Sequence, residues 1–296
     1  MYRILPRPLP SVLDPLTELA LDLRWTWHHG VDELWREVDA DIWGHTHNPW
    51  LVLQNTPQVQ LERLSGDPGF LQKLNSATDA RRHYLDTPGV CAARWGGEAP
   101  RHVAYFSMEF GLSEALPLYA GGLGVLAGDY LKTASDLDLP MVGVGLLFQE
   151  GYFRQIIDAD GKQSEAYPFN DPTNLPIQPA LGADNAWLEL ALPILGRTLR
   201  LRVWQAQVGR SRLYLLDSNH MLNGAADRGI TSKLYGGGSE MRLMQDVVLG
   251  IGGWALLDAL NCEVEVCHLN EGHAALAVLE RARRYMHRTG GTFHDA

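Results

Sequence analysis

The fold is decided by residues 102–147, which contain three informative segments: His102-Val103-Ala104-Tyr105-Phe106, Tyr119-Ala120-Gly121-Gly122-Leu123-Gly124-Val125-Leu126-Ala127-Gly128-Asp129, and Met141-Val142-Gly143-Val144-Gly145-Leu146-Leu147. The first and last segments are short apolar runs that predict buried strands, and residues 122–137 between them predict a helix. A strand, a helix and a second strand in this order are typical of parallel pairing. We therefore expect an α/β protein built on a parallel sheet.

The residues before this unit predict a helical region. Asp14-Pro15 and Asp67-Pro68 each place a capping side chain before a proline at the first helical position. Between Val31 and Val38, apolar residues recur at i, i+3, i+4 and i+7, as they do on one face of a helix. We expect the helical region to cover residues 1–95, because glycines and prolines concentrated in 86–101 indicate a linker or domain edge.

Tryptophans are concentrated in the helical region. Five of the nine in the chain are Trp25, Trp27, Trp35, Trp43 and Trp50. Flat indole rings can stack on the apolar faces of sugars, or they can form the aromatic core of a helical unit. Their spacing favours the core.

Strand patterns dominate after residue 147. Asp158-Ala159-Asp160-Gly161 predicts a hairpin turn, and Leu199–Val208 alternates apolar and polar side chains as a half-buried strand does. We expect a β-rich insertion at about residues 150–217 within an α/β domain that spans 96–296. The pattern then returns to helix, strand and helix, in the order Glu240–Leu260, Val264–Leu269 and Gly272–His287.

The composition is that of an ordinary globular protein, with 46% hydrophobic and 20% charged residues in a chain of 296. A net charge of −10 gives no general attraction to nucleic acid or to an anionic membrane, so any phosphate site has to be local. The sequence shows neither the apolar core of a signal peptide nor the ~18 apolar residues of a spanning helix. Cys91, Cys262 and Cys267 are too few for a disulfide framework. We expect a cytoplasmic protein with reduced thiols and no nucleic-acid or membrane partner.

Glycines are concentrated around the middle segment: eight of the thirty lie between Gly111 and Gly151. Residues 122–127 read G-x-G-x-x-A, but a loop at Ser113–Pro117 separates them from the preceding strand, whereas the dinucleotide fingerprint follows its strand directly. Glycines before a helix can expose backbone N–H groups to an anion, or they can permit close packing of the helix on the sheet. The residues alone leave both interpretations open.

Five motifs occur in a fixed order along the chain: Tyr105-Phe106-Ser107-Met108-Glu109-Phe110-Gly111, Gly121-Gly122-Leu123-Gly124-Val125-Leu126-Ala127, Leu234-Tyr235-Gly236-Gly237-Gly238, Glu240-Met241-Arg242-Leu243-Met244-Gln245 and His268-Leu269-Asn270-Glu271-Gly272-His273-Ala274-Ala275-Leu276. Together they resemble the N-terminal part of α-glucan phosphorylases (glycogen, starch or maltodextrin phosphorylases), in particular the shorter bacterial and archaeal branch. The resemblance covers essentially the whole chain. One departure is Gly111, where the longer branch has an aromatic residue.

The resemblance implies a fold and a reaction. The fold is a two-domain glycosyltransferase of the GT-B type, of which this chain would supply a helical extension and the Rossmann-like N-terminal half. The reaction releases α-glucose 1-phosphate from the ends of α-1,4-glucans with inorganic phosphate, so these compounds are the expected partners. The cofactor is pyridoxal phosphate held on a lysine, and its 5′-phosphate relays a proton to inorganic phosphate. Homo-oligomers are also compatible with the family.

The resemblance also implies where phosphate would bind. The backbone of Gly121, Gly122, Leu123 and Gly124, at a helix N-terminus, would approach the substrate or cofactor phosphate. Arg242, at the start of a later helix, could add a second positive charge. It could equally be a solvated surface residue.

Three side chains are candidates for catalysis: His273, Asn270 and Glu109. The first two follow the strand Val264–Leu269, at the end where open α/β sheets bind ligands, and both can donate hydrogen bonds to sugar or cofactor. Glu109 could stabilise a developing glycosyl cation, or it could pair structurally with an arginine. The spacing of His268 and His273 does not match the H-E-x-x-H pattern of zinc sites, so we expect no metal.

The cofactor lysine of the family lies in the C-terminal domain. None of the lysines, Lys73, Lys132, Lys162 and Lys233, stands in a segment like the family's cofactor motif. We therefore expect the C-terminal cofactor domain to be absent from this chain and the chain alone to be inactive.

Three other functions remain as alternatives. A non-catalytic glucan-binding or remnant fragment would need no cofactor. A glycogen- or starch-synthase-like glycosyltransferase shares the Gly-Gly-Leu-Gly loop, but it presents a lysine before that loop, which is absent here. A nicotinamide-dependent oxidoreductase would need an acidic residue at the end of the second strand, whereas Asp138 precedes that strand.

Overall fold

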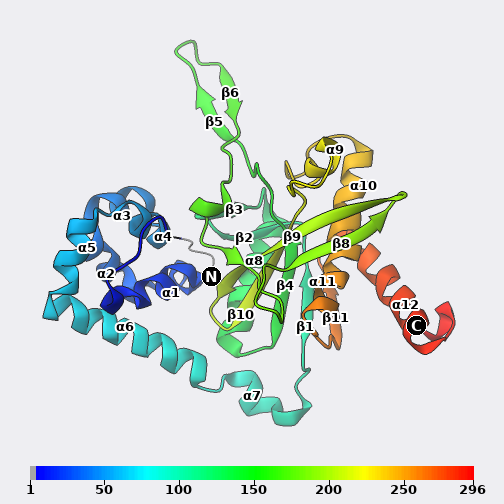
Figure 1. Ribbon diagram of the computed structural model, residues 1–296, viewed down its shortest axis with the longest axis horizontal. Helices are drawn as coiled ribbons and strands as arrows, with labels where there is room; N and C mark the ends of the chain where they lie inside the picture. The colour runs from blue at the N-terminus through cyan, green and yellow to red at the C-terminus, as the bar shows by residue number, and fades with distance from the viewer. Residues whose placement is uncertain (1–4) are drawn as a thin grey trace.

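Figure 1 shows the computed structural model, which describes residues 5–296; residues 1–4, at the start of the expected helical region 1–95, lie outside the described residues. Helices in blue and cyan form one side of the molecule, a sheet occupies the centre, and the last helices, in yellow to red, lie on the other side. Two hydrophobic cores follow this division, one within the helical region and one around the sheet. Within the described residues, no helix is both long enough and apolar enough to cross a bilayer.

The helical region is built from short helices that start and stop at turn residues. Asp67 begins the longest of them as expected, because its Oδ1 accepts hydrogen bonds from Gly69 N and Phe70 N, which the helix itself leaves free. The elements of this region are η1 (Ser11–Leu13), α1 (Pro15–Leu21), η2 (Leu23–Thr26), η3 (His29–Val31), α2 (Asp32–Val38), α3 (Ala40–Thr46), α4 (Pro49–Asn55), α5 (Gln58–Ser65), α6 (Pro68–Asp86), α7 (Val90–Trp95) and η4 (Gly96–Glu98).

The predicted aromatic core of this region is confirmed only in part. Trp35, Trp43 and Trp50 lie in the core of the helical region, whereas Trp25 lies in the core around the sheet and Trp27 packs against that core. Trp35 and Trp50 are fully buried, and Trp25 and Trp43 are 7% and 3% exposed. Trp27 is partly buried, and its Nε1 donates to Asp136 Oδ2 at 3.0 Å. These indoles stabilise the region by burial and do not present a platform for sugar.

The central sheet is mixed, which confirms the α/β class with parallel strands. Its strands lie in the order β11-β1-β4-β10-β9-β7, and β8 also pairs with β9. Neighbours from β11 to β10 are parallel, whereas β9 is antiparallel to β10. The strands are β1 (Val103–Phe106), β4 (Met141–Leu146), β7 (Gln178–Pro179), β8 (Glu189–Ile194), β9 (Arg197–Val208), β10 (Ser211–Asp217) and β11 (Val266–Leu269).

The strand–helix–strand unit predicted from residues 102–147 is present. Helix α8 (Gly122–Leu137) joins β1 to β4, and a ribbon of β2 (Phe110–Ser113) and β3 (Leu116–Leu118) precedes it. The strands expected in the β-rich insertion extend this same sheet, because β10 pairs with β4 and β9 continues from β10.

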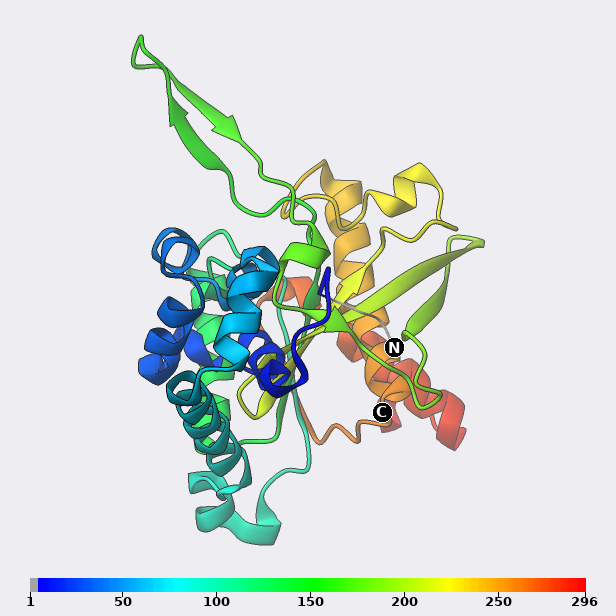
Figure 2. The same ribbon diagram turned by 60° about the vertical axis from the view of Figure 1, so that its left-hand side comes forward.

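One hairpin stands apart from the sheet. Strands β5 (Arg154–Ile157) and β6 (Gln163–Ala166) pair only with each other and project from the body (Figure 2). The turn is the predicted one: Asp158 Oδ1 accepts from Asp160 N and Lys162 N, and Gly161 has a φ of 78°.

The helix expected over 240–260 is interrupted. It consists of α10 (Ser239–Val247), a π-helical turn η6 (Val248–Gly252) and α11 (Gly253–Ala259). A Cβ at Gly250 would lie 2.6 Å from Ala277 N, and one at Gly253 would lie 2.6 Å from Phe106 Cε1. These glycines therefore permit close packing on β1 and on α12 (Leu276–Thr289). The remaining elements are η5 (Pro172–Asn174), α9 (Ala225–Arg228), η7 (Gly272–Ala274) and η8 (Phe293–Asp295).

Polar contacts hold the helical region to the sheet. Asp22 Oδ1 accepts from Gly209 N at 2.9 Å, in the turn between β9 and β10. Arg210, the next residue in that turn, donates from its guanidinium to Ser135 O at 2.8 Å and to Thr87 O at 2.9 Å. This turn therefore bonds to the residue before η2, to the residue after α6 and to α8.

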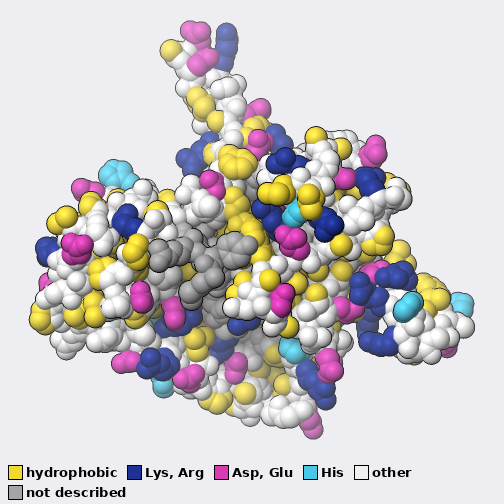
Figure 3. Space-filling model, in the orientation of Figure 1, with side chains coloured by type: hydrophobic (Ala, Val, Ile, Leu, Met, Phe, Trp, Pro, Cys, Tyr) yellow, Lys and Arg dark blue, Asp and Glu magenta, His cyan; other side chains and the backbone are white. Residues whose placement is uncertain are grey.

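Charges of both signs are interspersed over the face seen in Figure 3, and arginine side chains gather at α12. Two of the α12 arginines, Arg283 and Arg284, donate to the buried carboxylate of Glu280 at 2.7 and 2.6 Å. Part of this basic cluster is thus balanced within its own helix.

Candidate functional site

The carboxyl ends of β1, β4 and β11 lie at one edge of the sheet, where open α/β sheets bind ligands. Asn270, which follows β11, donates from its backbone N to Phe106 O at 2.9 Å and from its Nδ2 to Ser107 Oγ at 3.0 Å. Ser107 Oγ in turn donates to Glu109 O at 2.7 Å. Two of the three side chains that we selected as catalytic candidates, Asn270 and Glu109, thus belong to one hydrogen-bonded cluster.

Glu109 is 3% exposed and both of its oxygens have donors. Oε2 accepts from Ala120 N at 2.6 Å and from Gly121 N at 3.2 Å, and Oε1 accepts from Tyr235 OH at 2.6 Å. No arginine pairs with Glu109 among residues 5–296. The carboxylate instead fixes the glycine-rich loop from its buried side.

The glycines of that loop serve two purposes. A Cβ at Gly124 would lie 2.5 Å from Tyr119 Cβ, and one at Gly128 would lie 2.2 Å from Gly111 O. These positions, and Gly111 itself, are therefore required for close packing of α8 on β2. Gly121 and Gly122 are exposed and a Cβ at either would meet open space, so packing does not explain them.

The backbone donors at the start of α8 are only partly available. Gly121 N donates to Glu109, and Gly124 N donates to Gly121 O at 3.1 Å. Within the described residues, the N–H groups of Gly122 and Leu123 make no hydrogen bond and lie at the positive end of a 16-residue helix. The geometry therefore restricts the predicted anion site from four backbone positions to these two donors.

Tyr235 joins this cluster, although it was not among the site residues that we predicted. Burial, with the neighbouring Glu109 carboxylate, raises the pKa of Tyr235, so its phenol stays protonated and donates. Tyr235 has a φ of 54°, and Glu271, after β11, has a φ of 70°. Non-glycine residues in this region of backbone space carry strain, which concentrates at functional sites.

His273 lies beside the ring of Tyr235. Its ring centroid is 5.5 Å from that of Tyr235, and its Nδ1 is 3.4 Å from Asp246 Oδ1 on α10. Arg242, one helical turn before Asp246, is exposed, with its guanidinium carbon 5.8 Å from the centre of the Tyr235 ring. Burial raises the pKa of Asp246 above its usual range. Tyr235 therefore contacts both the Glu109 cluster and the group formed by His273, Asp246 and Arg242.

Sequence reasoning missed two members of this arrangement. The Leu234–Gly238 motif contained a signal for Tyr235, because the motif was part of the resemblance. Asp246 had no comparable signal, since its spacing of four residues from Arg242 occurs on any polar helix face. Within the described part of the chain, no three His, Cys, Asp or Glu side chains are arranged to hold a metal ion.

Known proteins are similar to this chain over most of its length. Maltodextrin phosphorylase of Thermococcus litoralis is 40% identical over 278 residues, which are 94% of this chain and 34% of that protein. Glycogen phosphorylase of Mycobacterium tuberculosis is 40% identical over 305 residues, covering 97% of this chain and 35% of that protein. The chain is thus similar, over nearly all of its own length, to proteins named maltodextrin phosphorylase and glycogen phosphorylase. It spans about a third of the length of these relatives.

A phosphorylase from Aquifex aeolicus, named glycogen phosphorylase, is 34% identical over 91% of this chain. Residues 9–116 also match a family model described as a protein of unknown function (DUF3417). That model covers the helical region from η1 onward, together with β1 and β2. The similarity to phosphorylases therefore includes the helical region as well as the sheet.

Proposed function

We propose that the chain is the N-terminal portion of an α-1,4-glucan phosphorylase of the GT-B type, a cytoplasmic enzyme that releases α-glucose 1-phosphate from glucan ends with inorganic phosphate. The observation that carries this proposal is the glycine loop, whose buried side is held by Glu109 and whose exposed side presents the N–H groups of Gly122 and Leu123. Relatives named for phosphorolysis of maltodextrin and glycogen support the choice of substrate.

Each residue of the site has a distinct role in this proposal. Gly122 and Leu123 donate to a phosphate oxygen, and Arg242 adds positive charge beside Tyr235. Glu109 acts as a positioning residue, because its carboxylate oxygens already accept hydrogen bonds from the loop and from Tyr235. Asn270 holds Ser107 and the start of α8, and His273 is left to donate to a sugar hydroxyl from its Nε2.

Pyridoxal phosphate fits this chain in part. When bound, it would supply a phosphate that exchanges a proton with inorganic phosphate, and the two open N–H groups suit such an anion. The covalent attachment does not fit. Lys132 lies on α8 with its Nζ 5.9 Å from the Trp27 ring, and Lys233 lies 3.1 Å from the Tyr167 ring. Lys73 pairs with Glu37 and Lys162 lies in the hairpin turn. We therefore propose that the lysine comes from polypeptide outside these residues, and that the chain alone does not turn over glucan.

A chimera tests this function. The matched segment of the Thermococcus litoralis maltodextrin phosphorylase is replaced by this chain, and release of glucose 1-phosphate from maltodextrin and inorganic phosphate is measured. We expect turnover by the chimera and none by the 296-residue chain. A chimera that melts cooperatively and binds pyridoxal phosphate, yet releases no glucose 1-phosphate, would refute the proposal.

A matched pair of variants in the chimera tests the role of Glu109. Glu109→Gln replaces one of the two carboxylate oxygens by an NH₂ group, which donates and cannot accept hydrogen bonds from the loop or from Tyr235. We expect turnover to fall by about 10²-fold, as when one preorganised hydrogen-bond donor is removed from an active site. Glu114→Gln changes an exposed carboxylate on the same segment and is expected to leave turnover unchanged.

A second candidate function, glucan binding without catalysis, is favoured by a separate feature. A cavity of about 230 Å³ beside β4 and β10 is lined by aromatic and amide side chains, among them Phe169, Trp204, Gln149 and Asn170. Such groups suit the apolar faces and hydroxyls of a sugar ring. Retardation of the isolated chain in native gels that contain glycogen, abolished by Phe169→Ala, would support this function.

A further inference from the structure

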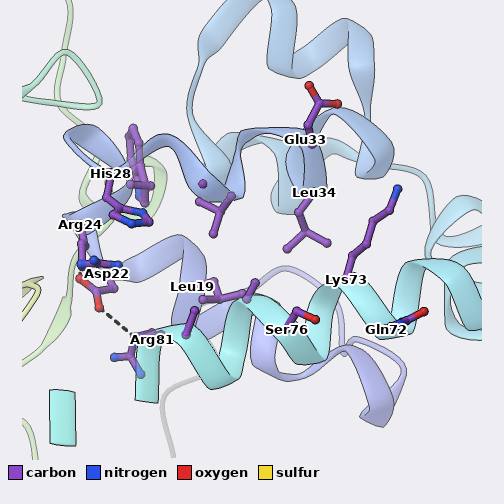
Figure 4. Close-up of a pocket in the computed structure, with 15 residues that line it drawn as sticks. Leu19, Asp22, Arg24, His28, Glu33, Leu34, Gln72, Lys73, Ser76 and Arg81 are labelled. Atoms are coloured by element: carbon purple, nitrogen blue, oxygen red, sulfur yellow. Dashed lines mark hydrogen bonds and ion pairs between the residues drawn. The ribbon is translucent and has the colours of Figure 1, made fainter. Parts of the chain in front are cut away.

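A second cavity lies away from the sheet edge, in the helical region. It has a volume of about 420 Å³ and is enclosed by α1, η2, η3, α2 and α6. This volume is within the ~300–1,000 Å³ typical of small-molecule sites. Figure 4 shows its lining, with Arg24 and His28 together at one end and Leu19 and Leu34 along the middle. We call it the helical-region pocket.

The middle of the helical-region pocket is apolar. Leu19 and Leu34 are 6% and 4% exposed, and Trp25, 7% exposed, adds an aromatic wall. Ala77 of α6 completes this wall with a small side chain. These residues fit the apolar body of a ligand and provide no hydrogen bonds to it.

Arg24 makes one end of the pocket cationic. Arg81, which also lines it, is paired with Asp22 at 2.8 Å and with Glu18 at 3.3 Å. Lys73 is likewise paired with Glu37. Within residues 5–296, the Arg24 guanidinium has no carboxylate partner, and its buried Nε has no hydrogen-bond partner.

The Asp22 carboxylate lies at the same end of the pocket in Figure 4, but it bonds to Arg81 and to the backbone N of Arg24 and forms no ion pair with the Arg24 guanidinium. The guanidinium carbon of Arg24 lies 3.9 Å from the centre of the Tyr84 ring, a contact that orients the cation without neutralising it. His28 lies beside it, and Glu33 is at the opposite end of the pocket in Figure 4. An unpaired guanidinium is a strong donor to carboxylate or phosphate oxygens.

We propose that the helical-region pocket binds a small organic anion, a carboxylate or a phosphate monoester with an apolar body. The anionic group would accept hydrogen bonds from Arg24 beside His28, and the body would lie between Leu19, Leu34 and Ala77. This is a function for the region matched by the model of unknown function, separate from the proposed phosphorolysis.

The same pocket is connected to the sheet. Asp22, on its wall, accepts from Gly209 N in the β9–β10 turn, and Arg210 of that turn lies 3.9 Å from the same Tyr84 ring that Arg24 contacts. A ligand that holds Arg24 therefore also restrains the attachment of the helical region to the sheet.

Ligand-observed NMR on the 296-residue chain tests the proposal with three probes. These are 3-phenylpropionate, phenyl phosphate and 3-phenylpropionamide, the uncharged analogue of the first. We expect both anions to bind and the amide to bind about tenfold more weakly, because it lacks the charge-assisted contact. Tighter binding of phenyl phosphate identifies a phosphate ester as the ligand type, and tighter binding of the carboxylate identifies a carboxylate.

Variants locate the binding. Ala77→Phe fills the pocket and is expected to abolish binding of all three probes. Arg24→Gln is expected to make the anions bind as weakly as the amide. Arg82→Gln removes an exposed arginine of α6 and should change nothing, because neither Arg82 nor its ion-pair partner Asp79 lines the pocket. Thermal melting of each variant verifies that it is folded.

Equal binding of acid and amide to the parent chain, or unchanged binding to a folded Ala77→Phe variant, would overturn the proposal. Hydrogen exchange at Gly209 N that is not slowed by a bound anion would reject the connection to the sheet.

Discussion

Tyr235 and Glu109 form the contact on which the glycine loop depends. Tyr235→Phe removes the hydroxyl group that donates to Oε1 of the buried Glu109 carboxylate at 2.6 Å. We expect the free energy of unfolding to fall by about 1.5–3 kcal/mol, the range for hydrogen bonds to charged groups. Urea unfolding measures the change. Hydrogen exchange at Ala120 N and Gly121 N should also become faster, because Glu109 is then less firmly held.

Tyr152→Phe is the matched control, since Tyr152 is 57% exposed and lies at the base of the hairpin. The two variants lose the same hydroxyl group. If both leave stability and amide exchange unchanged, the Tyr235 bond does not hold the loop.

Asp227 provides a test of pH dependence. Arg197 holds the pKa of Asp227 below its usual value of 3.8 through hydrogen bonds of 2.7 and 2.9 Å. A carboxyl with a lowered folded pKa adds stability above pH 3.8 and loses it as the pH falls through the folded value. Because the Arg197 side chain is 45% exposed, we expect Asp227→Asn to cost only about 0.5–1 kcal/mol at pH 7.

Denaturant unfolding at several pH values distinguishes this effect from loss of packing. The difference between Asp227→Asn and the parent chain should shrink as the pH falls below about 3.8. Asp160→Asn, in the exposed hairpin turn, is the control. A difference that stays constant with pH would mean that the ion pair is not its source.

At the scale of one element, α8 shows how position decides the effect of a glycine. Gly128→Ala places a Cβ about 2.2 Å from Gly111 O, a backbone atom that cannot move aside. We expect a loss of about 1–3 kcal/mol, as for overpacked cores. Gly122→Ala, on the same helix, meets open space and should be neutral or stabilising by up to about 1 kcal/mol. Urea unfolding of the pair measures this contrast; equal losses would contradict the packing explanation.

The bounds of α8 were predictable because its signals are local: glycines before it, apolar periodicity within it and Asp138 after it. The hairpin turn at Asp158–Gly161 and the start of α6 at Asp67 were predictable for the same reason. The parallel pairing of β10 with β4 was not, since it joins segments about seventy residues apart through contacts that no local pattern specifies. The bond between Glu109 and Tyr235, 126 positions apart, is of the same kind.

At the scale of the whole molecule, Arg210 links the helical region to the sheet. Arg210→Gln removes the donors to Ser135 O and Thr87 O. We expect the attachment to weaken by about 1.5–3 kcal/mol, while each hydrophobic core stays folded. Limited proteolysis should then cut faster within residues 86–101, where the two parts are joined.

Arg212→Gln is the control for Arg210→Gln, because Arg212 is exposed on β10 and, within residues 5–296, its side chain makes no hydrogen bond or ion pair with the helical region. Equal cutting rates in both variants would show that the two parts are held together by other contacts.

The outer position of β11 has a consequence for handling the protein. Among the described residues, β11 pairs with β1 on one side, and Val266 is 46% exposed. Its other side presents unpaired N–H and C=O groups beside an apolar side chain, which is a template for a strand from a neighbouring molecule. The purified chain should therefore aggregate through this edge as its concentration rises. Val266→Lys should reduce that aggregation, because a charged side chain on an edge strand opposes pairing with another molecule.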